Sequence, residues 1–131
     1  MKTKITRFFL MFAGMTGIYI GASLLFTPVS FEASAGIPVT DNVNLLSEIR
    51  SSGGTLLAAG MLILIGGFRI AMTRTALIVS SLFYSAYGIS RVISILIDGL
   101  PNISLVLITA SELVIGMLSI LLLLNFQRDE K

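Results

Sequence analysis

Charged residues divide this chain into four long apolar runs, and this division limits the possible folds more than any other feature. A charged side chain costs about 3 kcal/mol at the centre of a helix in lipid, so the gaps between charges are candidate membrane spans. Two gaps are close to the roughly 20 residues that cross a bilayer, and two further apolar runs of that length each contain one internal charge, Arg91 and Glu112. The predicted spans lie at about 8–26, 51–68, 75–97 and 103–124. We therefore predict an all-α fold, an integral membrane four-helix bundle that forms a single domain.

Composition argues against a soluble protein and against several kinds of site. The chain has 131 residues, of which 55% are hydrophobic and 12% charged, which is too little polar surface to cover a soluble globule. It contains no Cys and no His, so disulfides and thiolate or imidazole metal sites are excluded. We expect no metal and no cofactor. The basic residues occupy chain ends and short turns without interleaved aromatic residues, so nucleic acid is not an expected partner.

The first run also resembles a secretory signal peptide. Basic residues precede it, and Ala33, Ser34 and Ala35 follow it as an A-x-A cleavage site would. Its 19 residues at 8–26 exceed the 7 to 15 expected of a signal-peptide core. We therefore expect this run to be retained as the first span.

The distribution of Lys and Arg between the loops predicts the orientation of the bundle. One end of the bundle is expected to carry Lys2, Lys4, Arg7, Arg69, Arg74, Arg128 and Lys131. The other end has mainly acidic residues, with only Arg50 and Arg91 nearby. Because basic loops stay inside, both termini are predicted to lie in the cytoplasm.

The connection between the first two spans, residues 27–47, is left unassigned. Pro28 is expected to end the first helix, and Asp41 is a candidate N-cap for a second helix that begins before residue 51. Gly36 suggests a turn. Glu32 and Asp41 are able to reach the mouth of a polar pocket, but we favour a solvated loop.

Glycines at helical spacing predict close packing of the first two spans, because helices in lipid associate through close backbone approach. These glycines are Gly14, Gly17, Gly21, Gly53, Gly60 and Gly67. Gly17 and Gly21 form a GxxxG pattern, and those in the second run are seven residues apart. A permeation groove lined by backbone is the alternative, which nothing in the sequence favours.

The third run carries a polar stripe. At 100° per residue, an arc of about 80° contains Ser80, Tyr84, Tyr87, Arg91, Ser94 and Asp98. The opposite side is apolar, with Ile78, Leu82, Ile89, Ile93 and Leu96. Such a stripe has to face protein or water, because polar side chains are expensive in lipid.

Arg91 in the third run and Glu112 in the fourth lie at similar depths. At 1.5 Å per residue they are roughly 9 Å and 13 Å from the outer end of their helices, which is within side-chain reach. An Arg and a carboxylate satisfy one another by strong hydrogen bonds, whereas either one alone in the bilayer is costly. We therefore predict an intramembrane ion pair between Arg91 and Glu112.

Further residues are expected around this pair. The predicted polar cluster comprises Arg91, Glu112, Asp98, Arg50, Tyr87, Tyr84 and Glu48. Tyr87 lies one helical turn from Arg91, and Asp98 is placed to hold the guanidinium or to cap the turn. Residues two apart on a helix do not face one another, so only one of Glu48 and Arg50 is expected to join, and we favour Arg50.

The chain resembles a family of short bacterial membrane proteins, Domain of Unknown Function 4345. The resemblance covers most of the chain and rests on Arg50 followed by Gly53 and Gly54, on Arg91, on the Asp-Gly-x-Pro at 98–101 and on Glu112. The family often has Gly directly before the third-helix Arg, where this chain has Ser90. The resemblance implies four helices in a bacterial inner membrane, but no activity, substrate or cofactor.

In one interpretation, the polar cluster has no function beyond holding the helices in register. If it does have one, three function classes remain open. The first is a binding or accessory protein that holds a membrane lipid, a small ligand, a second copy or a larger membrane complex. The alternative is a proton-coupled small-molecule transporter that acts as an oligomer, with Glu112 as the proton carrier. An enzyme would use Asp98 and Glu112 as acid and base, with Arg91 holding an anion. The sequence has no nucleophile motif, so no catalytic residue is assigned.

Overall fold

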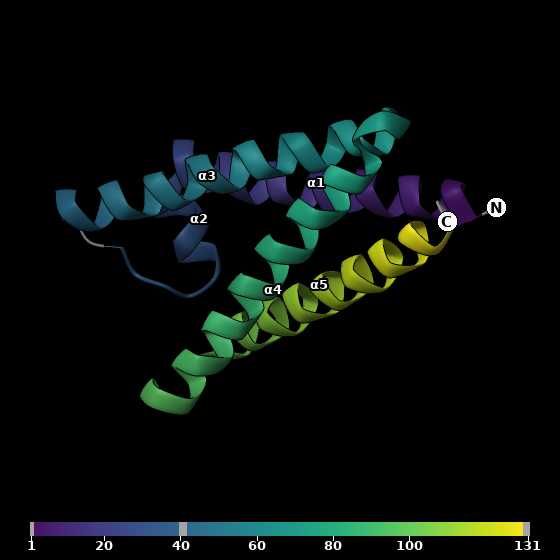
Figure 1. The fold of residues 1–131 in the computed structure, drawn as a ribbon. Coiled ribbons are helices and arrows are strands. Elements are labelled where there is room, and N and C mark those ends of the chain that lie inside the picture. The colour runs from purple at the N-terminus through teal and green to yellow at the C-terminus, as the bar shows by residue number, and fades with distance from the viewer. Residues whose placement is uncertain (1, 40–41, 130–131) are drawn as a thin grey trace.

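The computed structural model describes residues 2–39 and 42–129, and most of these residues are helical (Figure 1). The elements are α1 (Lys2–Phe26), α2 (Pro28–Ser34), α3 (Val43–Phe68), the 3-10 turn η1 (Ile70–Met72), α4 (Thr73–Asp98) and α5 (Ile103–Asp129). The helices α1, α3, α4 and α5 are long and apolar enough to cross a membrane. The predicted all-α fold with four helices of spanning length is therefore confirmed.

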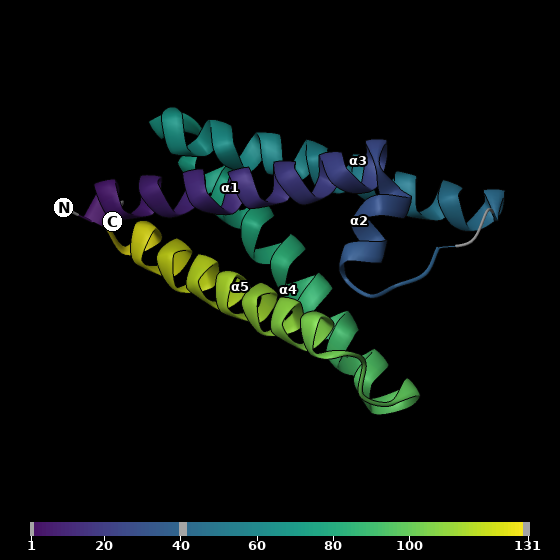
Figure 2. The same ribbon diagram turned by 180° about the vertical axis from the view of Figure 1, so that it is seen from behind.

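The four long helices form two antiparallel hairpins that diverge. The helices α1 and α3 lie side by side, as do α4 and α5, and both views show the two pairs separating toward one end (Figures 1 and 2). The labelled N- and C-termini lie together at the opposite end, which we call the termini end. The short helix α2 projects into the space between the hairpins at the other end, which we call the open end.

The contact between α1 and α3 is a contact of backbones. The predicted glycines of both helices lie in it: a Cβ at Gly14 would meet the backbone of Leu64 at 2.6 Å, and one at Gly21 would collide with the backbone of Leu57. Gly17 and Gly60 face each other, and a Cβ at Gly17 would lie 3.1 Å from the Cα of Gly60. Any larger side chain at these positions would have to push the helices apart.

The hairpins are held together by an apolar core near the termini end. Leu10 and Ala13 from α1, Ile63 from α3, Leu77 from α4 and Ile115 from α5 are all buried in one cluster. The residues from α1, α3 and α4 lie in the half of their helix that is nearer the termini end, and Ile115 lies at the middle of α5. The bundle is therefore closed at the termini end and open at the other.

The residue that caps the start of α3 is not the one that we predicted. The Asn42 side chain caps this helix, since its Oδ1 accepts from the N–H groups of Asn44 and Leu45 at 3.0 Å and 3.3 Å. Asp41, which we predicted as the cap, lies outside the described residues. The helix begins at Val43, before residue 51, as the sequence allowed.

The prediction of a solvated loop after the first span is wrong for residues 28–34, which form α2. Pro28 stands at the first helical position, where its missing N–H leaves no bond unmade. Gly36 adopts a φ of +79° and ends the helix. The N–H of Ile37 donates to Glu32 O at 2.9 Å, and that of Gly36 to Ala33 O at 3.0 Å, which is the Schellman pattern of helix termination.

Substitution of Gly60 tests the backbone contact. We expect Gly60→Ala to lower the melting temperature by several degrees, because its Cβ would lie 2.6 Å from the backbone N of Ile18, and overpacking of this kind costs about 1–3 kcal/mol. The matched control is Gly54→Ala on the same helix, whose Cβ would meet nothing within 4 Å. It should be neutral or stabilising, since Ala is the better helix former. Thermal unfolding followed by circular dichroism in detergent measures both, and equal effects would contradict this account of the contact.

Candidate functional site

Arg91 of α4 and Glu112 of α5 are in contact between the two helices. The Arg91 Nε donates to Glu112 Oε2 at 2.9 Å. The Arg91 side chain is 35% exposed, whereas that of Glu112 is 11% exposed. Within residues 2–39 and 42–129, no other acceptor bonds to Arg91, so the four N–H groups on its Nη1 and Nη2 atoms are not used by the protein.

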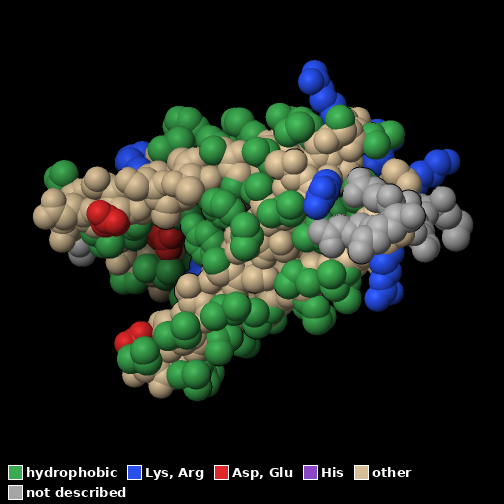
Figure 3. Space-filling view, in the orientation of Figure 1, with side chains coloured by type: hydrophobic (Ala, Val, Ile, Leu, Met, Phe, Trp, Pro, Cys, Tyr) green, Lys and Arg blue, Asp and Glu red, His purple; other side chains and the backbone are tan. Residues whose placement is uncertain are grey.

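The pair lies in the wall of a pocket between the hairpins, which we call the interhairpin cleft. This cleft has a volume of about 230 Å³. Its apolar lining consists of Ile20, Leu24, Phe31, Ala35, Ile37, Leu105 and Ile108, and its charged lining of Glu32, Arg91 and Glu112. Figure 3 shows acidic and basic atoms recessed in the space between the hairpins. The cleft thus combines an apolar wall with three charged groups from three different helices.

Glu32 is the charged residue that α2 brings to the cleft. It is half-buried and lines the cleft together with Arg91. Burial raises the pKa of the Glu32 carboxyl above its ordinary value of 4.5, and the positive charge of Arg91 acts in the opposite direction. Among the described residues it has no hydrogen bond and no ion pair through its side chain.

Asn102 holds α2 and its following turn over the cleft. Its Oδ1 accepts from the N–H of Leu105 at 3.1 Å, which caps α5, and its Nδ2 donates to Ala35 O at 2.8 Å. One side chain therefore fixes both the start of α5 and the end of α2. This link joins the first hairpin, from which α2 continues, to the second.

A smaller cavity lies deeper in the bundle, behind Glu112. This central cavity has a volume of about 70 Å³ and is lined by Tyr84, Tyr87 and Glu112 among mainly apolar residues. The Tyr84 hydroxyl donates to Ala13 O of α1 at 2.6 Å, which ties α4 to α1. No partner of the Tyr87 hydroxyl is found within the described part of the chain. Tyr87, which was predicted to belong to the polar cluster around the ion pair, lines this cavity with Glu112 but has no hydrogen bond to the pair.

The polar stripe of α4 faces the bundle over most of its length. Ser80 and Tyr84 are buried, and Ser80 shares a hydrogen bond of 2.8 Å with Ser119 of α5. The opposite apolar side is exposed, as Leu82 and Leu96 illustrate at 64% and 79%. Helical periodicity thus identified the inward face of this helix correctly.

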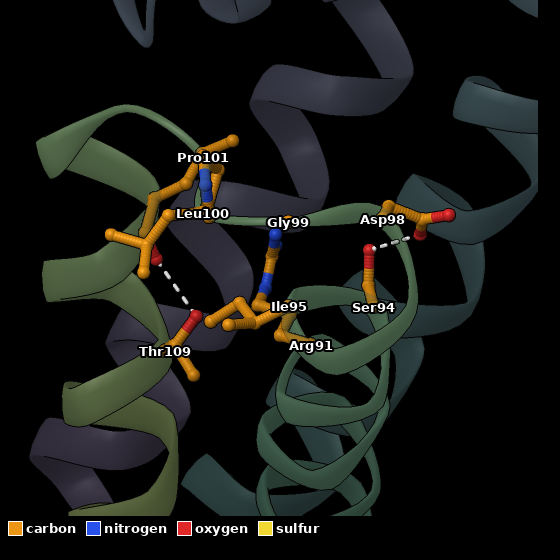
Figure 4. Close-up of a pocket in the computed structure, with 9 residues that line it drawn as sticks. Arg91, Ser94, Ile95, Asp98, Gly99, Leu100, Pro101 and Thr109 are labelled. Atoms are coloured by element: carbon orange, nitrogen blue, oxygen red, sulfur yellow. Dashed lines mark hydrogen bonds between the residues drawn. The ribbon is translucent and has the colours of Figure 1, made fainter.

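Asp98 lies at the open end of α4, apart from the ion pair. It lines a pocket of about 280 Å³ with Arg91 at the turn to α5, but its carboxylate accepts from Ser94 at 2.9 Å (Figure 4). Figure 4 places Asp98 and Ser94 together, across the pocket from Thr109. Asp98 and Glu112 line different pockets, so an acid and base pair made of these two residues is not supported.

The structure does not bring Arg50 and Glu48 to the cluster. Arg50 is exposed on α3, and its Nη1 donates to Leu25 O at the end of α1. The last carbonyl groups of a helix lack partners within the helix and carry partial negative charge, which attracts a guanidinium. Arg7 makes the equivalent bond at the other end, from its Nε to Gly67 O at 2.8 Å. Glu48 is exposed on the same helix as Arg50.

Part of the site was not predicted from the sequence. Glu32 was named as able to reach the mouth of a polar pocket, but a solvated loop was favoured for it, whereas the structure places it in the cleft lining. Asn102 was not considered. Gly88 and Gly116 allow α4 and α5 to approach: a Cβ at Gly88 would lie 2.7 Å from the Leu113 side chain, and one at Gly116 would lie 2.6 Å from Ser85 Oγ. Within the described ranges, no group of three His, Cys, Asp or Glu residues is arranged to hold a metal ion.

The fold and the site define a class of small helical protein with four helices of membrane-spanning length and a charged cleft between two diverging hairpins. The sequence matches the family Domain of unknown function (DUF4345) over residues 5–123, and the chain belongs to this family. No curated protein and no solved structure matches the chain.

The half-buried position of Glu32 predicts a dependence of stability on pH. Because burial raises its pKa in the folded state, the folded protein holds the proton where the unfolded chain has lost it, and stability falls as the pH rises through this range. Glu32→Gln cannot ionise. We therefore expect it to melt up to a few degrees above the wild type at neutral pH, with a difference that shrinks as the pH falls through 4.5. A difference that grows on acidification would contradict the assignment.

Proposed function

We propose that this protein binds an amphiphilic small molecule or a lipid in the interhairpin cleft. The observation that carries the proposal is the hydrogen bonding of the Arg91 guanidinium. One of its N–H groups donates to Glu112, and the other four have no partner among the described residues. A charged group in an apolar bundle is expensive unless its hydrogen bonds are satisfied. A ligand or water in the cleft has to provide the remaining partners.

A purely structural role of the ion pair is less well supported. The helices are already held in register by the glycine contacts of α1 with α3 and by the bond from Tyr84 to Ala13. A register lock would also be expected to close around the pair, whereas Arg91 and Glu112 line an open cleft together with a third charged residue, Glu32. Ligand binding uses all three groups, and a register lock uses two.

Proton-coupled transport is a weaker candidate. Glu112 lines both the cleft and the central cavity, and beyond this cavity lies the apolar core that includes Leu10, Ile63 and Leu77. Transport would require this core to open or a second copy to widen the path. Binding requires no such rearrangement, and it remains compatible with an accessory role in a homo-oligomer or a larger membrane complex.

We further propose that the protein is a multi-pass protein of the bacterial inner membrane with both termini in the cytoplasm. Lys and Arg side chains gather at the termini end, and acidic side chains lie toward the open end (Figure 3). The positive-inside rule then places the termini end in the cytoplasm and the cleft toward the outer side. In this orientation Arg91 and Glu112 form an ion pair within the outer half of the membrane.

Cysteine labelling tests this orientation, because the chain has no Cys of its own. Single substitutions at exposed positions are suitable: Ser34→Cys on α2 at the open end and Ala71→Cys in the turn at the termini end. In intact bacterial cells or spheroplasts, a membrane-impermeant maleimide should label the Ser34→Cys protein. It should label the Ala71→Cys protein only after the membrane is permeabilised. The reverse pattern would show that the bundle has the opposite orientation.

Native mass spectrometry tests binding in the cleft. We expect wild-type protein in a mild detergent to carry a bound mass that is reduced at least tenfold by Arg91→Gln or Glu112→Gln, since a hydrogen bond to a charged group is worth about 1.5–3 kcal/mol. Glu48→Gln, at an exposed position outside the cleft, is the matched control and should retain the mass. If nothing binds and the two cleft substitutions only lower thermal stability, the ion pair is structural and the proposal is wrong.

A further inference from the structure

We propose that the ligand is a zwitterionic aminophospholipid, with its phosphate at Arg91, its primary ammonium at Glu32 and one acyl chain in a groove along α1. This inference rests on the proposed function and names the class of ligand. It follows from the charges of the cleft, its size and the apolar groove that continues from it.

Arg91 provides a site for the phosphate. Its Nε is held by Glu112, which fixes the plane of the guanidinium and leaves the Nη1 and Nη2 edge free of other described partners. This edge presents parallel N–H donors that match two oxygens of a phosphate. Glu112 therefore acts as a positioning residue for Arg91.

Glu32 provides a site for the ammonium. Its carboxylate lines the same cleft from α2 and has no bond to another described side chain. With Glu112 and Glu32 both ionised, the two carboxylates outweigh the single charge of Arg91, so a head group with only negative charge would be repelled. A zwitterion matches the site, since its cation meets Glu32 while its anion meets Arg91. A primary ammonium can donate hydrogen bonds to the carboxylate, whereas a quaternary ammonium cannot.

The cleft is large enough only for the head group. Its volume of about 230 Å³ is below the roughly 300–1,000 Å³ of pockets that enclose whole drug-sized ligands. The remainder of an amphiphile has to lie outside the cleft, on an apolar surface that begins at its edge.

Such a surface is present along α1. The α1 groove has a volume of about 550 Å³ and is lined by Phe12, Met15, Thr16, Tyr19, Ile20 and Phe31. Ile20 and Phe31 line both the groove and the cleft, so the two are continuous. The rings of Tyr19 and Phe31 meet edge to face at 6.1 Å, which joins α1 to α2 at this point.

The groove also runs in the direction that an acyl chain requires. From Ile20 to Phe12 it extends roughly 12 Å toward the termini end, at 1.5 Å per residue. In the proposed orientation this direction leads from the outer surface toward the middle of the bilayer. The arrangement is that of a lipid of the outer leaflet, with its head group at the open end.

Competition between lipids with identical acyl chains tests the class of head group. Purified protein would be incubated with equal amounts of phosphatidylethanolamine, phosphatidylglycerol and phosphatidylcholine, and the retained lipid would be identified by native mass spectrometry. We expect phosphatidylethanolamine to be preferred over both others. Glu32→Gln should lower this preference about tenfold, as expected for loss of a charge-assisted hydrogen bond, whereas the exposed control Glu48→Gln should not change it.

A second pair of variants tests the groove. Met15→Trp would fill the α1 groove. The matched control is Phe8→Trp, at a position on the same helix that does not line the groove. Both side chains are exposed, Met15 at 63% and Phe8 at 72%. Retention of phosphatidylethanolamine should fall about tenfold in Met15→Trp and remain unchanged in Phe8→Trp. Equal retention of phosphatidylethanolamine in both variants would show that the acyl chain does not lie in the α1 groove, and it would overturn this part of the proposal.

The outcomes separate this inference from the proposed function. If phosphatidylglycerol or phosphatidylcholine is preferred and Arg91→Gln removes it, the cleft binds an amphiphile, but the assignment to an aminophospholipid is wrong. If none of the three lipids is retained and the purified wild type carries no bound mass, the proposed function fails as well. Retention that neither Glu32→Gln nor Arg91→Gln changes would place the lipid elsewhere and overturn the inference.

Discussion

The close approach of α1 and α3 is the constraint on which the rest of this structure depends. Glycines let the two backbones touch over most of the length of both helices, from Gly67 near the termini end to Gly53 near the open end. The hairpin is therefore straight and tightly packed, and its two helices cannot spread around a third. The second hairpin has to pack against it from one side, which it does through the apolar core near the termini end. The two hairpins are free to diverge beyond that core, and this divergence creates the interhairpin cleft.

The cleft explains how an ion pair is accommodated in an apolar bundle. A fully enclosed Arg and Glu would each lose their hydration, and the attraction between them often repays this loss incompletely. In this structure Glu112 is nearly enclosed, while about a third of the Arg91 side chain remains exposed. The desolvated carboxylate has the guanidinium as its partner, and the guanidinium has access to whatever fills the cleft. The same divergence that opens the bundle thus supplies the additional hydrogen-bonding partners that Arg91 requires.

The sequence predicted the parts of this arrangement that depend on periodicity and on the cost of charge in lipid. Gaps between charges located the four long helices, and the spacing on α4 identified the face that carries Ser80 and Tyr84 into the bundle. The sequence could not place Arg50, because its partner is the backbone carbonyl of Leu25 and no side-chain pattern marks that atom. The sequence does mark the two ends of α2, with Pro28 at its start and Gly36 just past its end. Seven residues are too few, however, for hydrophobic periodicity to identify a helix. Gly88 and Gly116 were missed because each is the only glycine of its helix, so neither forms a GxxxG pattern.

The position of Glu32 depends on both hairpins, and this gives α2 a particular place in the structure. Its first residue follows directly from α1, whereas the chain at its end is held by Asn102, which caps α5 on the second hairpin. The Schellman turn at Gly36 sends the chain back across the cleft and leaves Ala35 O free to accept from Asn102. Because α2 is attached to one hairpin at each end, the angle between the hairpins sets how far the Glu32 carboxylate lies from Arg91. A ligand that bridges these two side chains therefore has to stabilise one particular angle between the two hairpins.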